Sequence, residues 1–434
     1  MKSKKFVLAA LALLAITGLL ALAGCKNDSV SETPKYTVTF NTDGGSTVVS
    51  QTVESGQKAK EPAEPELEGS WFLGWYSDEG LSKKFDFNTS ITTATTVYAK
   101  WSYKLHTKPT TLTNYTNSHA PEGEWTYVEF GDWPQTILKG DVNVYEDKSK
   151  QMEMFTYYLG SDDNYYVKHS DKYYKVEPIV WRVLNKDYAS TGNALLLAEK
   201  ILTGGIPYYV DLNKRTITGA GTKEGEPDIV YPNNWQYSTI RAWLNGLDVV
   251  KSDDPLENDK TYTNNGFLQT AFTADAQSLI AATTVDNSAA STIPLGITDK
   301  DYEWFWNSGE NPYASDTPTK DKIFLLSEQE ATNSDYGFDE YDRWVGDDYG
   351  TTTITRIRDT TDYAEATGAY PGDSSAGYGG WWWLRSPNCV IESYARDIDF
   401  DGYANGRNDR DFADYSNVYF AYGGVVPALS ISLQ

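Results

Sequence analysis

The chain has 434 residues, a formal net charge of −24 at pH 7 and 40% hydrophobic residues. It is long enough to bury a sizeable core, in about two domains, and too acidic to bind nucleic acid through a basic patch. It contains two cysteines and three histidines, and one of the cysteines ends the N-terminal leader described next. This inventory excludes an internal disulfide, a thiolate pair and an imidazole cluster for a soft metal.

Residues 1–24 have the pattern of a secretory signal peptide. Lysines precede an apolar run, and small residues then lead to Cys25. The final Leu-Ala-Gly-Cys resembles the leader of bacterial lipoproteins, in which the cysteine is acylated and becomes the first residue. We therefore expect Cys25 to carry lipid and residues 25–35 to form a tether. The expected location is the bacterial cell envelope, at the outer membrane or cell surface, and an uncleaved membrane anchor is the alternative.

Residues 36–101 alternate between strand-like and turn-like segments, with "YTVTFNTDGG", "WFLGWYSD" and "TTVYAKW" as predicted strands. This order resembles the small β-grasp-like repeat of internalin-type (Listeria and Bacteroides) surface proteins. The resemblance implies a spacer or adhesion module outside the cell. Phe72, Trp75 and Trp101 are expected to form its aromatic core. The polar residues 102–124 are expected to be a linker or the first irregular part of the region that follows.

Residues 125–434 are predicted to form one large α+β domain. "STIRAWLNG" predicts a helix with Ser238 as N-cap, "TADAQSLIAA" a second helix opened by Thr273, and Ser327 to Glu330 a capping box for a short third helix. Apolar segments such as "VEPIVWRVLN", "ALLLAEKIL", "WWWLRSP" and "GGVVPALSISL" predict strands, several of them central.

The order of these segments resembles an uncharacterised family of bacterial surface domains with the C-type-lectin-like fold of formylglycine-generating enzymes. One departure is Val426, which stands where the family usually has arginine. Enzymes with this fold use paired cysteines for copper or clustered histidines for iron, and this sequence has neither. We therefore expect a protein that is not an enzyme and has no cofactor. A secreted hydrolytic or carbohydrate-active enzyme and a structural envelope protein are the alternatives.

The stretch "DIDFDGYANGRN" imitates the calcium loop of an EF-hand. Asp397, Asp399 and Asp401 occupy its first, third and fifth positions, and Gly402 occupies the sixth. Position twelve is Asn408 instead of glutamate, however, and no helical pattern flanks the stretch. Its alternation predicts a β-hairpin with the carboxylates on one face. A calcium site formed by the three aspartates is the alternative.

The segment from Asn388 to Tyr422 has the composition of a recognition surface. Of its 35 residues, four are Asn, six Asp, five Tyr and two Ser, a mixture that combines broad contact area with adaptable hydrogen bonding. We expect it to bind an extracellular protein or glycan, and a solvated irregular loop is the alternative. The predicted ligand contacts are Tyr394, Asp397, Asp399, Tyr403, Asn405, Asn408, Asp409, Asp411, Asp414, Tyr415, Asn417, Tyr419 and Tyr422.

The preceding "WWWLRSP" is expected to be scaffold. Trp381, Trp382 and Trp383 would provide bulk, and Arg385 would pair with a buried carboxylate or carbonyl group. The segment that follows also resembles the variable part of receptors encoded with diversity-generating retroelements, in which adenines of asparagine-type codons are randomised. Asn, Asp, Tyr and Ser are among the products of that process. The resemblance implies a binding face that varies between copies of the gene.

Overall fold

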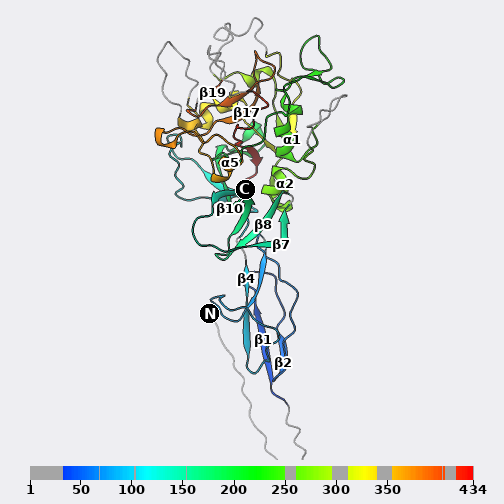
Figure 1. The fold of residues 1–434 in the computed structure, drawn as a ribbon, viewed down its shortest axis with the longest axis vertical. Coiled ribbons are helices and arrows are strands. Elements are labelled where there is room, and N and C mark those ends of the chain that lie inside the picture. Colours follow the sequence, from blue (N-terminus) through cyan, green and yellow to red (C-terminus); the bar gives the residue numbers. More distant parts are fainter. Residues whose placement is uncertain are drawn as a thin grey trace, which may run out of the picture.

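The computed structural model describes residues 33–67, 69–101, 104–152, 154–249, 261–295, 311–339, 354–402, 404–405 and 417–433. These residues form a small unit at one end of the molecule and a large domain at the other (Figure 1). Each has a hydrophobic core of its own. Across the described residues the structure is mostly β-sheet, with a few short helices.

The small unit is a four-stranded sheet in the order β2-β1-β4-β3. The strands β1 (Lys35–Asn41) and β4 (Thr95–Trp101) are parallel, and the pairs with β2 (Gln51–Glu54) and β3 (Phe72–Tyr76) are antiparallel. Trp75 is buried, and the ring of Phe72 packs edge-on against both Trp75 and Trp101. The predicted aromatic core is thus present, whereas β2 was not predicted because its four residues are mostly polar.

The large domain is built around a nine-stranded antiparallel sheet. Its two longest strands, β6 (Tyr127–Ile137) and β10 (Lys172–Asn185), pair with each other. The strand β11 (Ala194–Ala198) pairs with β10 and is buried along its whole length, as its apolar sequence predicts. The other strands are β5 (Thr110–Thr111), β7 (Val144–Met152), β8 (Phe155–Gly160), β9 (Tyr165–His169), β16 (Ile323–Phe324) and β20 (Ala428–Ile431).

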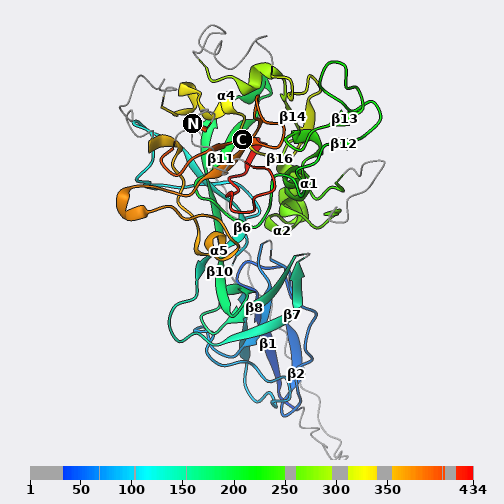
Figure 2. The ribbon, with the colours of Figure 1, turned by 45° about the horizontal axis from the view of Figure 1, so that its top comes forward.

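Short helices and small sheets surround this sheet. Figure 2 shows α1 and α2 together on one side of the large domain, with the segment near residue 375 on the opposite side. The helices are α1 (Thr239–Asn245), α2 (Phe267–Ala271), α3 (Ala274–Leu279), α4 (Glu328–Ala331) and α5 (Asp362–Ala366). Two further pairs of strands are β12 (Arg215–Thr216) with β13 (Ile229–Val230) and β14 (Thr283–Val285) with β15 (Thr319–Asp321).

The predicted helix caps are present. The hydroxyl of Ser238 accepts the N–H of Arg241 at the start of α1. At α4, Ser327 and Glu330 each accept the backbone N–H of the other, which is the reciprocal capping box. Local signals therefore defined the ends of these helices correctly.

Residues 104–124 belong to the large domain and are not a free linker. Within this segment β5 adds to the edge of β6, and His106 and Asn117 bond to side chains of Asp132 and Glu199. The boundary between the two units therefore lies close to residue 102. The sequence left both possibilities open, because polar residues whose partners are distant in the chain have the same composition as a linker.

The small unit and the large domain are in direct contact. The ring of Trp71 lies 4.4 Å from that of Tyr165 and 6.0 Å from that of Tyr157, measured between centroids. Lys100 Nζ lies 2.9 Å from a carboxylate oxygen of Asp163. An apolar contact and an ion pair thus join the two units.

Candidate functional site

The predicted ligand segment begins in a three-stranded antiparallel sheet. Its strands are β17 (Trp382–Pro387), β18 (Ala395–Ile398) and β19 (Ala404–Asn405). Gly402 lies between β18 and β19 with a φ of 86°, a conformation that favours glycine. Its carbonyl oxygen accepts a hydrogen bond of 2.8 Å from Arg356. The acidic stretch is therefore a β-hairpin, as its alternation predicts.

The carboxylates of this hairpin are less accessible than the sequence indicates. All four residues of β18 are buried, and Asp397 is 1% exposed. Asp399 is half-buried, and burial raises its pKa to about 6, although a hydrogen bond from the Phe400 N–H opposes the shift and the charge of Asp401 adds to it. Because β18 is covered on both faces, Asp397 is not placed to contact a large ligand.

The three aspartates of the hairpin are not placed together as a group that could hold a metal ion. Across the described parts of the chain, no group of three or more His, Cys, Asp or Glu side chains is placed to hold a metal ion. Asn405 lies in β19 opposite Asp397. The other predicted contacts Tyr403, Asn408, Asp409, Asp411, Asp414 and Tyr415, and the lipidation residue Cys25, lie outside the described residues.

The end of the predicted segment, residues 417–422, is attached to the large domain through its backbone. Val418 is fully buried. Its N–H donates to the carbonyl of Ser393, and its carbonyl accepts from the N–H of Tyr209, at 2.9 Å and 3.0 Å. Asn417 forms a β-bridge with Tyr394. The structure thus brings two predicted contacts together and holds the backbone beside them.

Glycines bring the same segment close to the tryptophan strand. A Cβ atom at Gly423 would collide with the indole nitrogen of Trp383, and one at Gly424 would lie 3.0 Å from the carbonyl oxygen of Trp381. Trp381, Trp382 and Trp383 are all buried. The backbone at Gly423 and Gly424 therefore packs directly against this buried tryptophan strand.

Four aromatic residues gather at this position, and we call them the aromatic surface: Tyr370, Tyr419, Phe420 and Tyr422. Three of them are largely exposed, with Tyr370 at 50%, Tyr419 at 57% and Tyr422 at 62%. The ring of Phe420 lies 6.5 Å from that of Tyr419 and 6.0 Å from that of Tyr422. The N–H of Tyr370 donates to the carbonyl of Tyr422 at 3.1 Å, which joins the fourth residue to the group.

Sequence reasoning identified Tyr419 and Tyr422 but missed Tyr370 and Phe420. Phe420 is not one of the residue types that marked the segment, and Tyr370 lies outside the segment. No spacing in the sequence connects Tyr370 to Tyr422, since they meet through a backbone contact between distant parts of the chain.

Buried ion pairs join the strands β17 and β18 to the helix α4. Arg385, which was expected to pair with a buried group, donates to the carboxylate of Glu330 and to the carbonyl of Leu325. Burial acts to raise the pKa of Glu330, but the charge and hydrogen bond of Arg385 outweigh it and lower that pKa. Glu328 lies 3.2 Å from Arg396, and burial raises the pKa of Glu328 to about 7. These pairs connect α4 to β17 and β18.

Comparison with known proteins finds two family matches. Residues 36–100 match the Listeria-Bacteroides repeat domain, which is typical of bacterial surface proteins, and residues 191–433 match a family described as Domain of unknown function (DUF6273). Among the described residues, no helix has the length and apolar character needed to cross a membrane.

Two similar proteins come from Evansella cellulosilytica. One, named "Putative membrane protein", is 42% identical over 93 residues, which are 21% of this chain and 14% of that protein. The other, named "Putative Gly-rich membrane protein", is 42% identical over 76 residues, which are 17% of this chain and 9% of that protein. The matched part is thus a small fraction of either relative. The DUF6273 match, in contrast, spans more than half of this chain, and the chain belongs to that family.

Proposed function

We propose that this protein is a cell-surface binding protein and that its aromatic surface contacts the ligand. The observation that carries the proposal is the pair of exposed tyrosines, Tyr419 and Tyr422, beside Phe420 on an anchored backbone, to which the exposed Tyr370 is joined by a backbone hydrogen bond. Exposed aromatic clusters are uncommon on soluble surfaces without a partner. Tyrosine gives large contact area and a hydroxyl for hydrogen bonding at a low cost in conformational entropy.

The expected anchor and the domain order support this function. A lipid on Cys25 would hold the N-terminus at the membrane, and the names of the two Evansella relatives also refer to a membrane. The repeat would then act as a spacer between the membrane and the large domain, since the two units lie at opposite ends of the molecule (Figure 1). We infer that the large domain has the C-type-lectin-like fold that its sequence resembles, and its antiparallel strands and few short helices support this inference.

The proposed ligand is an extracellular protein or glycan, and no catalytic step is included. The test uses the full-length chain in detergent on an array of glycans and extracellular-matrix proteins. We expect at least one array component to bind the wild-type protein and to bind the Tyr419→Ala/Tyr422→Ala variant much more weakly. Binding that is equal for both proteins would contradict the proposal, as would turnover of a polysaccharide or peptide by the purified chain.

The composition of residues 388–422 supports a further part of the proposal, that the binding face is diversified by a retroelement. Deep sequencing of the gene segment from sibling isolates tests it. We expect substitutions to concentrate at the Asn, Asp, Tyr and Ser codons while the codons of Trp381 to Trp383 stay constant. A segment of identical sequence in all isolates would contradict diversification and would indicate a receptor with one evolved ligand.

A further inference from the structure

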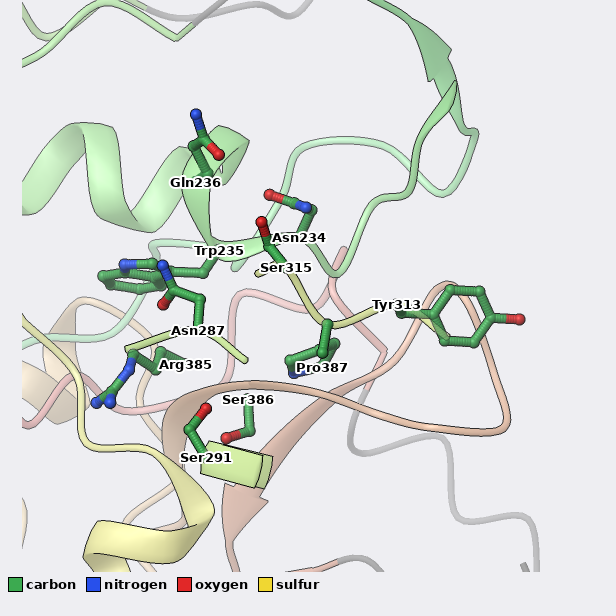
Figure 3. A pocket seen from close by; sticks show the side chains of 11 residues that line it. Asn234, Trp235, Gln236, Asn287, Ser291, Tyr313, Ser315, Arg385, Ser386 and Pro387 are labelled. Carbon is green, nitrogen blue, oxygen red and sulfur yellow. The ribbon is translucent and has the colours of Figure 1, made fainter. Parts of the chain in front are cut away.

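A small pocket with several polar side chains lies at the end of β17 (Figure 3), and none of the residues that line it belongs to the aromatic surface. Its lining includes Asn234, Asn287, Ser291, Ser315 and Ser386. The inner space accommodates about one water-sized group. The pocket therefore suits a single polar group of a ligand whose remainder lies outside.

Two buried amides of this pocket have an oxygen without a partner. Asn234 is 4% exposed and Asn287 is 7% exposed, and neither Oδ1 atom accepts a hydrogen bond within the described part of the chain. The amide nitrogen of Asn287 donates to Thr319 at 3.2 Å, which sets the orientation of that amide. A buried acceptor without a partner is costly, so these oxygens call for a donor from outside the chain.

The hydroxyls and the charge of the pocket restrict that donor. Ser386 accepts from the N–H of Glu328 at 3.0 Å, and within the described parts of the chain its own hydroxyl hydrogen has no acceptor and could bond to a ligand. Arg385, also in the lining, donates to Glu330 and to the carbonyls of Leu325 and Asp286. Its charge is therefore balanced, and the lining residues that the structure describes include no carboxylate to balance a cation.

We propose that this pocket binds a hydroxyl group of a neutral saccharide. A sugar hydroxyl donates and accepts, which matches amide oxygens beside a serine hydroxyl. Tyr313, which also lines the pocket, is buried, and its ring packs edge-on against that of Tyr231, so the polar groups carry the contact with the sugar. The proposal does not depend on the aromatic surface, so the two can be tested separately.

The experiment titrates the full-length chain in detergent with glucose, galactose, mannose and N-acetylglucosamine, followed by saturation-transfer NMR. We expect at least one sugar to bind with a Kd of about 1 mM, as is common for a ligand held by few contacts. Asn234→Leu, which fills the space and removes one acceptor, should weaken binding about tenfold or more. The matched control Asn213→Leu changes an exposed asparagine of the same domain and should leave binding unchanged.

Asn234→Ala replaces Asn234→Leu if the larger side chain lowers the melting temperature. The Tyr419→Ala/Tyr422→Ala variant should bind the sugar as the wild type does, which separates this proposal from that of the aromatic surface. The inference is overturned if none of the four sugars binds, if Asn234→Leu and Asn234→Ala bind as well as the wild type, or if methylammonium competes with the sugar. Failure of all four sugars would indicate that an ordered water fills the pocket.

Discussion

At the residue scale, Gly423 sets how closely the aromatic surface approaches its support. Any side chain at this position would collide with the indole of Trp383. Gly423→Ala should therefore lower the free energy of unfolding by about 1–3 kcal/mol, as overpacking does in a buried site. Urea unfolding measures it, with Gly80→Ala as the control, because Gly80 is exposed and its nearest neighbour is a side-chain oxygen of Asp78 at 3.3 Å. If the urea midpoint of Gly423→Ala equals that of the wild-type protein, Gly423 is not packed against Trp383 as described.

At the element scale, the segment that contains β5 is held by a histidine between two carboxylates. His106 Nδ1 lies 2.9 Å from Asp132, and Nε2 lies 3.6 Å from Glu129. Burial of the ring acts to lower the pKa of His106, and the positive charge of Lys104 acts in the same direction. The hydrogen bond to Asp132 and the charges of Asp132 and Glu129 outweigh both effects, so the pKa of His106 is raised. Because the folded-state pKa is above the unfolded value of about 6.5, the stabilisation is complete below that pH and is lost as pH rises through the folded pKa.

The prediction is that His106→Gln lowers the melting temperature more at about pH 5.5 than at about pH 8.5. The control is His169→Gln, because the ring of His169 packs against Tyr363. An equal loss for His106→Gln at both pH values would show that the ion pair does not stabilise the segment.

At the scale of the whole molecule, the sequence predicted the parts that depend on local signals. The repeat, the caps of α1 and α4 and the buried strand β11 follow from turn residues, capping residues and apolar runs. Burial of both faces of β18 was not predicted, because Arg396 and Asp397 are polar and the partner Glu328 is far away in the chain. Tyr370 and Phe420 of the aromatic surface and the pocket lined by Asn234 and Asn287 were also missed, since the surface and the pocket each join segments that only the fold brings together.

The central claim is that the aromatic surface forms the binding face. The most direct measurement is the Kd of the strongest array ligand for the wild-type protein, for Tyr419→Ala/Tyr422→Ala and for Tyr145→Ala, which removes a tyrosine that is 66% exposed on β7. We predict a loss of at least about tenfold, or about 1.4 kcal/mol, for the double variant and none for Tyr145→Ala. Equal affinities for all three proteins, with unchanged melting temperatures, would contradict the account.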